Sequence, residues 1–229
     1  MILLRKKLDP YILVIFLLLE TVLYGCILTT HGKTLVVTEY ASIIGCFLLS
    51  LVYLCSRNAL LCCGLLFTLM ADFCLVICDP IQQLWGMVFF LLAQSCYAWM
   101  LHKEGLPQWI LPLRIGMTAV VLGVAFVVLG KNTDALALVS MAYYVNLIVN
   151  LLCAFLRFSS NRLMAIGFVC FLLCDTVIGL QTAAGAYLPI AEGSWLYGII
   201  FMDFHLSWFF YLPSQVLIAL HGRKKMRKG

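Results

Sequence analysis

Long apolar runs separated by short polar segments set the pattern of this chain. Most runs approach the length of about 20 residues that crosses a hydrocarbon core of roughly 30 Å as an α-helix. Membrane-spanning strands would alternate apolar and polar positions, and these runs do not alternate. We therefore predict an all-α polytopic membrane protein with eight transmembrane helices. Their approximate ranges are 10–29, 39–55, 59–78, 81–101, 109–129, 135–156, 163–186 and 195–220.

Three local features refine these helices. Glu20 interrupts the first run, which is also too long for a signal peptide, so we expect a retained first helix. Asp79-Pro80 ends the third helix, because proline disfavours helical backbone in the residue before it. Pro213 should kink the eighth helix and free a backbone carbonyl near Phe209.

The chain also resembles itself at a shift of 103 positions, which lays residues 159–175 on residues 56–72 without a gap. Six of the 17 aligned positions are identical. They are Ser56/Ser159, Asn58/Asn161, Leu60/Leu163, Gly64/Gly167, Leu69/Leu172 and Asp72/Asp175. We predict a single integral membrane domain over residues 1–229, built from two parallel four-helix repeats at about 10–101 and 109–220.

Composition supports the membrane assignment. The chain is 64% apolar and only 11% charged, with a mean hydropathy of +1.06, whereas about a quarter of a soluble chain is charged. The net charge of +5 could indicate nucleic-acid binding, but eight of the 15 basic residues lie near the two chain ends. Such clusters orient membrane proteins and contact anionic lipid headgroups. We predict membrane lipid and no nucleic acid as partners.

The basic residues also predict a topology. Eight helices would place 13 basic residues on the side of the two termini and only Lys33 and Lys131 on the other side. Both termini are therefore expected in the cytoplasm. Short loops favour a bacterial inner membrane over the endoplasmic reticulum, and the oligomeric state stays open.

Ionisable groups inside a bilayer are costly and mark candidate functional positions. They are Glu20, Asp72, Asp175, Asp203 and His205. Asp72 and Asp175 lie 13 and 12 residues from the starts of their predicted helices, so they should share one depth and face one cavity. The structural alternative is a pair of buried carboxyls that accept hydrogen bonds from Ser, Thr or Tyr.

Polar side chains at helical spacing add four stripes to these acids. The stripes are Gln94 with Tyr97, Tyr143 with Asn146 and Asn150, Trp208 with Tyr211 and Gln215, and Glu20 with Tyr24. Hydrogen bonding between helices explains any one stripe, whereas all four together predict a polar intramembrane cavity.

Several chemistries lack their motifs. The chain has no G-x-S-x-G elbow, no H-E-x-x-H and no phosphate-binding Gly-rich loop. The 11 cysteines lie mostly in apolar runs, where they pack as small hydrophobes. We predict no metal and no cofactor, and carboxylate acid–base catalysis remains the most plausible chemistry for an enzyme.

Four segments resemble elements of the YhhN lysoplasmalogenase-like family, in the same order and over essentially the whole chain. Residues 69–72 resemble its G-D-x-x-L element and residues 89–97 its F-x-x-A-H-x-x-Y helix. Residues 171–175 resemble its F-x-x-S-D helix and residues 211–215 its Y-x-x-A-Q segment. Three positions depart from the family pattern: Ala71 replaces Gly, Gln94 replaces His and Cys174 replaces Ser.

The resemblance implies hydrolysis of the vinyl ether of lysoplasmalogen to a fatty aldehyde and a glycerophospho-amine. Asp72 and Asp175 would be the catalytic carboxyls, and Gln94, Tyr97, Tyr211 and Gln215 would position headgroup or water. Gln94 can hydrogen-bond a substrate but cannot shuttle a proton as histidine does. Asn146, Asn150, Glu20, Asp203 and His205 complete the predicted substrate-binding set. A small transporter or proton-coupled carrier, and a non-catalytic lipid-binding protein, are the alternatives.

Overall fold

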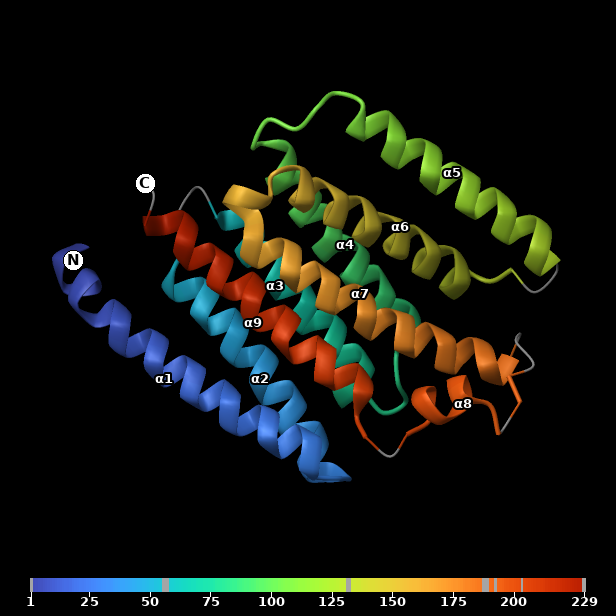
Figure 1. Ribbon diagram of the computed structural model, residues 1–229, viewed down its shortest axis with the longest axis horizontal. Coiled ribbons are helices and arrows are strands. Elements are labelled where there is room, and N and C mark those ends of the chain that lie inside the picture. The colour runs from blue at the N-terminus through green and yellow to red at the C-terminus, as the bar shows by residue number, and fades with distance from the viewer. Residues whose placement is uncertain are drawn as a thin grey trace.

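A computed structural model describes residues 2–54, 58–130, 133–186, 190–191, 193–202 and 204–227. These described residues contain nine α-helices and one short π-helix (Figure 1). The helices are α1 (Ile2–Thr29), α2 (Lys33–Val52), α3 (Ala59–Asp72), η1 (Phe73–Ile77), α4 (Gln83–His102), α5 (Ile110–Leu129), α6 (Ala135–Leu156), α7 (Phe158–Ala186), α8 (Trp195–Ile200) and α9 (Leu206–Arg227).

Seven helical segments in the described part of the chain are long and apolar enough to cross a membrane, which confirms a multi-pass membrane protein. They correspond to the first seven predicted helices. The 22-residue α9 would extend about 33 Å at 1.5 Å per residue. It runs through the bundle beside α1, α2, α3 and α7. Helix α9 is not one of the seven candidate spans, because its polar residues and basic end lower its hydropathy. The count of eight spans therefore remains a prediction.

The predicted eighth helix is divided, which corrects the continuous span at 195–220. The short α8 ends at Ile200, whose carbonyl accepts a hydrogen bond of 2.8 Å from Gln181 Nε2 on α7. Helix resumes at Leu206. His205 therefore lies in a connection between helices, where an uninterrupted intramembrane helix was expected. Asp203 and Ser56 lie outside the described residues.

Two helices, α1 and α2, begin earlier than predicted, at Ile2 and Lys33 in place of residues 10 and 39. Helix α7 (Phe158–Ala186) contains a kink at Asn161, whose φ of −111° and ψ of 23° are not helical, so its long part begins close to the predicted residue 163. The Asn161 side chain donates to Glu104 Oε2 at 2.7 Å, so the expected loop is a turn tied to the end of α4. Helix α2 starts at Lys33, which moves Glu39 from the expected helix end into a buried position.

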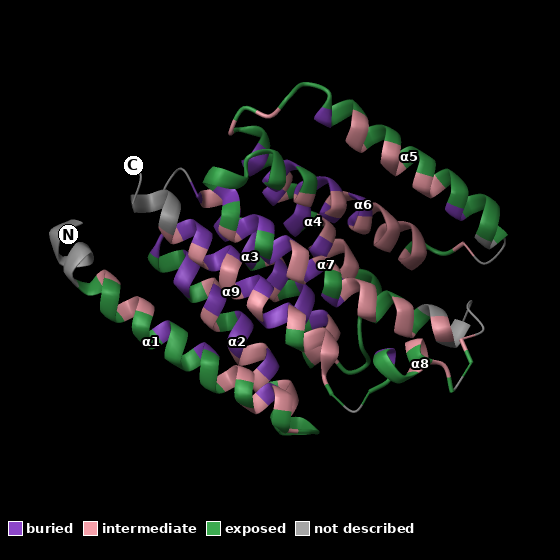
Figure 2. Ribbon diagram, in the orientation of Figure 1, coloured by how far each residue is buried: buried purple, intermediate pink, exposed green. Residues whose placement is uncertain are grey.

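The core lies where α3, α4, α6, α7 and α9 meet, as the concentration of buried residues in Figure 2 shows. Helices α1 and α5 lie at opposite outer edges (Figure 1). Their outward side chains are apolar, and Val127 on α5 is 81% exposed. Such a surface suits lipid, which accepts apolar side chains where water would not.

Two glycines allow close helix packing. The position of a Cβ on Gly64 of α3 is taken by the ring of Tyr97 on α4. A Cβ on Gly167 of α7 would lie 3.1 Å from the carbonyl oxygen of Ser214 on α9. Small residues at helix contacts let backbones approach where lipid supplies little hydrophobic driving force.

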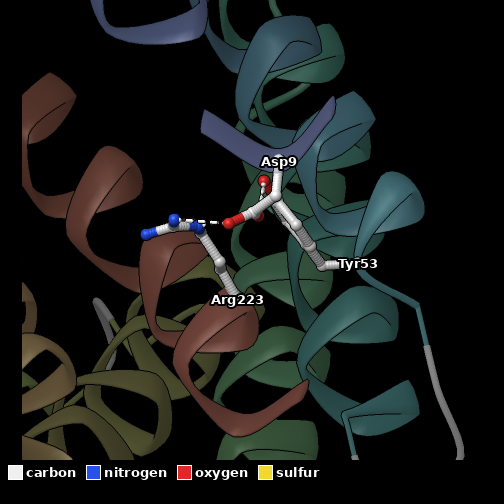
Figure 3. A network of polar contacts seen from close by, with 3 residues as sticks. All are labelled: Asp9, Tyr53 and Arg223. Carbon is white, nitrogen blue, oxygen red and sulfur yellow. Dashed lines mark hydrogen bonds and ion pairs between the residues drawn. The ribbon is translucent and has the colours of Figure 1, made fainter. Parts of the chain in front are cut away.

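A polar cluster joins the two ends of the chain (Figure 3). Arg223 of α9 contacts Asp9 of α1 through Nη2–Oδ2 at 2.6 Å and Nε–Oδ1 at 3.0 Å. Tyr53, which follows α2, donates to Asp9 Oδ1 at 2.8 Å. Burial and this hydrogen bond raise the pKa of Tyr53 to about 12. Arg223, which the sequence analysis counted among the basic residues that set topology, also forms an ion pair with Asp9, and Asp9 in turn bonds Tyr53 at the end of α2.

Candidate functional site

Asp72 is the last residue of α3, just before the π-helical turn, and it is buried. Tyr211 of α9 donates its hydroxyl to Asp72 Oδ2 at 2.6 Å. The same carboxyl lies within electrostatic range of Asp175 and of Glu39. A π-helical turn widens the helix locally and often occurs at functional positions. The structure thus joins two residues that the sequence analysis selected separately.

Asp175 of α7 has a matching arrangement. The hydroxyl of Tyr143, on α6, donates to Asp175 Oδ2. Tyr143 is buried and belonged to a predicted polar stripe, but the sequence did not identify its partner. Each predicted catalytic carboxyl is therefore held by a tyrosine hydroxyl from a different helix.

Two aromatic rings, of Phe90 and Phe171, contact the tyrosines of both Asp–Tyr pairs. The Phe90 ring of α4 lies 5.6 Å from the ring of Tyr143 and 6.4 Å from that of Tyr211, between centroids. Phe171 of α7 lies 5.5 Å from Tyr211 by the same measure. The two pairs belong to one aromatic cluster inside the bundle, where few polar groups screen their charges.

A second group of polar side chains lies near the start of α5, at the end of the bundle that carries both termini. Asn150 of α6 donates through Nδ2 to the backbone oxygen and Oε1 of Gln94, at 2.8 and 2.9 Å. Its own Oδ1 accepts from Arg114 Nη2 of α5 at 2.7 Å. Arg114 Nη1 also donates to Asn146 Oδ1. The predicted residues Gln94, Asn146 and Asn150 thus form one network with Arg114.

Besides Glu20 and His205, three predicted residues keep a buried polar atom without a hydrogen bond among the described residues. These atoms are Gln94 Nε2, Tyr97 Oη and Gln215 Oε1. Gln215 uses its other atom, Nε2, to donate to Ser214 Oγ at 3.1 Å. Buried polar atoms are nearly always paired, so such exceptions indicate positions where water or a ligand would bind.

Glu20 and His205 form no hydrogen bond to either Asp–Tyr pair among the described residues. The buried Glu20 carboxyl of α1 lies over Gly45 of α2, and neither oxygen has a hydrogen bond in the described part of the chain. The His205 ring lies 5.3 Å from that of His31, in the connection between α1 and α2. The predicted carbonyl freed by Pro213 is confirmed: Phe209 O accepts from Tyr24 Oη at 3.0 Å.

Sequence reasoning missed two groups near the site. Arg114 was counted only as a topology determinant, although a cation five residues into an apolar helix is itself an unusual signal. Glu39 was placed at a helix end because the start of α2 was set too late. Among the described residues, no three His, Cys, Asp or Glu side chains are grouped to hold a metal ion.

Comparison with known proteins identifies the family. The model of the YhhN family matches residues 40–221, which is most of the chain and includes both Asp–Tyr pairs and the Arg114 network. The chain belongs to the YhhN family. The match leaves α1, with Glu20, outside the region shared with this family. Searches of curated proteins and of solved structures found no match.

Proposed function

We propose that this YhhN-family protein is a membrane hydrolase that cleaves the vinyl ether bond of lysoplasmalogen. The products would be a fatty aldehyde and glycerophospho-ethanolamine or glycerophospho-choline. The resemblance of the chain to lysoplasmalogenases motivates this reaction. The observation that carries it is a pair of carboxyls inside the bundle, the buried Asp72 and the half-buried Asp175, each bonded to a tyrosine hydroxyl within one aromatic cluster.

The chemistry of a vinyl ether suits such a pair. An acid first protonates the outer alkene carbon, which leaves an oxocarbenium ion stabilised by the ether oxygen. Water then adds to this cation, and the hemiacetal collapses to aldehyde and alcohol. One carboxyl group would give the proton, and the other, as a carboxylate, would stabilise the cation and orient the water. Two neighbouring carboxyl groups at low dielectric favour one protonated and one ionised member, because two negative charges would repel each other.

The tyrosines fit supporting roles in this scheme. Each donates to only one oxygen of its aspartate, Oδ2, which fixes the orientation of the carboxyl group. The surrounding rings of Phe90 and Phe171 would limit access of bulk water to the cation. Gln94 and Gln215, each with an unbonded buried polar atom, are placed to bind water or the substrate glycerol.

We further propose that the two halves are related by a twofold axis along the membrane normal. The packing supports this relation: α1–α2, α2–α3 and α3–α4 have counterparts in α5–α6, α6–α7 and α7–α9. Across the halves, α2 packs on α9 and α4 on α6. The same shift of 103 relates Tyr40 to Tyr143. Such a duplication predicts that the two acids lie at one depth in the membrane.

Purified protein with lysoplasmenyl-ethanolamine, scored for released aldehyde, tests the proposed function. We expect release by the wild type and a loss of about 10²–10⁴-fold in Asp72→Asn and in Asp175→Asn, the usual range for acid–base catalysis. Asp79→Asn is the matched control, because Asp79 is exposed and seven residues from Asp72. Folded wild-type protein that releases no aldehyde would refute the proposal, and transport without chemistry would favour a carrier.

A further inference from the structure

Arg114 is a half-buried cation within a predicted membrane span, Ile110–Val128. It donates to two neutral amides, and no carboxylate of the described residues lies within ion-pair distance of it. An uncompensated guanidinium at this depth is costly. The guanidinium bonds to Asn146 and Asn150 and also contacts the buried thiol of Cys153. Because it carries five N–H donors, donors remain for an anion.

The groups around Arg114 hold it in place. Asn146 and Asn150 lie one helical turn apart on α6 and accept from different nitrogens of the guanidinium. Asn150 is in turn fixed by Gln94, to which it donates twice. The remaining amide nitrogen of Gln94, which is fully buried, has no hydrogen bond among the described residues. A cation and a buried unbonded donor thus lie in one connected network.

We infer that Arg114 binds the phosphate of a lysophospholipid, and so selects phosphate-bearing ether lipids for the site proposed above. A guanidinium binds phosphate oxygens in a fork geometry that neutral side chains cannot reproduce. This inference rests on the proposed function for the identity of the reacting lipid, but the phosphate contact itself does not depend on turnover.

The spacing along α6 agrees with the length of such a headgroup. Asn146 and Asn150 lie three and seven residues beyond Tyr143, which is about 5 to 10 Å along the helix axis at 1.5 Å per residue. Seven bonds separate the phosphorus of lysoplasmalogen from the vinyl carbon that takes the proton. An extended chain advances roughly 1.2 Å per bond, so this distance is about 8 Å. Phosphate at Arg114 would therefore place the vinyl ether near Tyr143 and Asp175.

This placement also gives the lipid an orientation. Arg114 lies four residues after Ile110, the first residue of α5, and so about 6 Å from that helix end. The α5 start is on the side of the bundle that carries both termini (Figure 1). The headgroup would point to that side, and the hydrocarbon chain would continue towards the opposite side.

A binding experiment on the full chain in detergent tests the inference without catalysis. The probes are a saturated 1-alkyl lysophospholipid, which has no vinyl ether to cleave, and the 1-alkylglycerol of the same chain length. We expect the wild type to prefer the phosphate-bearing lipid by about 10- to 100-fold, the range of a charge-assisted hydrogen-bond pair. Arg114→Gln should lose this preference through a larger fall in lysophospholipid binding than in alkylglycerol binding, and Arg114→Lys should lose part of it.

Arg162→Gln is the matched control, because Arg162 is exposed near the same end of the bundle and outside the network. An unchanged preference in Arg114→Gln would overturn the inference. If the wild type binds both lipids equally, the inference is overturned whether or not Arg114→Gln folds. Displacement of the lysophospholipid by equimolar inorganic phosphate would assign the site to free phosphate and overturn the lipid assignment.

Kinetics then separate the two proposals. If the wild type releases aldehyde, Arg114→Gln should raise KM for lysoplasmenyl-ethanolamine by about 10- to 100-fold with a smaller change in kcat. Its turnover of 1-alkenylglycerol, which lacks phosphate, should fall much less than its turnover of lysoplasmenyl-ethanolamine. A loss of kcat on both substrates would indicate structural damage and contradict the phosphate contact. Lipid preference without aldehyde release would refute the hydrolase and retain the phosphate site.

Discussion

At the scale of single residues, the two aspartates depend on their tyrosine partners for position. A hydrogen bond to a charged group contributes about 1.5–3 kcal/mol. Tyr211→Phe and Tyr143→Phe should therefore each lower kcat for aldehyde release by about 10- to 100-fold, because the ring stays in the cluster and only the hydroxyl is lost. Steady-state assays on the two variants measure this.

Tyr144→Phe provides a matched control for both changes. Tyr144 follows Tyr143 on α6, and its hydroxyl is hydrogen-bonded to Thr176 Oγ1 at 2.9 Å, one residue beyond Asp175. Its loss should leave kcat within about twofold of the wild type, since surface or non-site changes stay within about 0.5 kcal/mol. Equal losses in all three variants would show that the hydroxyls act through folding alone.

The sequence could identify the aspartates but not what surrounds them. Asp72 and Asp175 stand out because an acid inside an apolar run is rare. Their partners, Tyr211 and Tyr143, come from helices that are neighbours only in the folded bundle, and helical spacing carries no information about such contacts. Arg114 was missed for a related reason, because near a helix end a cation also fits a role in topology.

At the scale of helices, Gly64 and Gly167, which are equivalent in the two repeats, differ in how much room there is for an added Cβ atom. Gly64→Ala should destabilise the protein by about 1–3 kcal/mol, because its Cβ would overlap the buried ring of Tyr97. Gly167→Ala should cost less, since its nearest neighbours are 3.1 Å away. Denaturant titration in mixed micelles measures both. Gly123→Ala is the control, with nothing within 4 Å of its Cβ, and a loss equal to that of Gly64→Ala would contradict the packing argument.

The cluster at the chain ends gives α1, α2 and α9 a pH dependence. The pKa of Tyr53 is raised from 10.0 to about 12, so its stabilising contribution is complete below pH 10 and is lost as the pH rises from about 10 to 12. Between about pH 9 and 11.5, the thermal unfolding midpoint should fall less in Tyr53→Phe than in the wild type. Tyr11→Phe, which removes a tyrosine that is 67% exposed, should follow the wild type. Identical slopes for Tyr53→Phe and the wild type would contradict this linkage.

The length of each apolar run was enough to predict that a helix exists, but it did not fix the residues at which the helix begins and ends. Asp203 and His205 interrupt the apolar run at 195–220, but they were interpreted as functional intramembrane positions. One helix was therefore predicted where α8 ends at Ile200 and α9 begins at Leu206. The α8 end is stabilised by Gln181, a contact from another helix. The start of α2 shows the same limit, because this helix begins at Lys33, six residues before the predicted start at Glu39.

At the scale of the whole molecule, Asp9 and Arg223 bring the first and last described helices together. Both termini consequently lie at the same end of the bundle (Figure 1), as an even number of crossings requires. The excess of basic residues at this end predicts that it faces the cytoplasm. The phosphate site at Arg114 would then accept lysophospholipid from the cytoplasmic leaflet.

Reporter fusions to each terminus test this orientation in cells. We expect a reporter that is active only in the cytoplasm to be active at both ends, and a tag at residue 131, between α5 and α6, to be accessible from the other side. Arg223→Gln should leave the orientation unchanged, because the remaining basic residues at the termini still set it. Termini on opposite sides would contradict both the even count and the cytoplasmic entry of substrate, whereas two external termini would reverse only the leaflet from which the lipid enters.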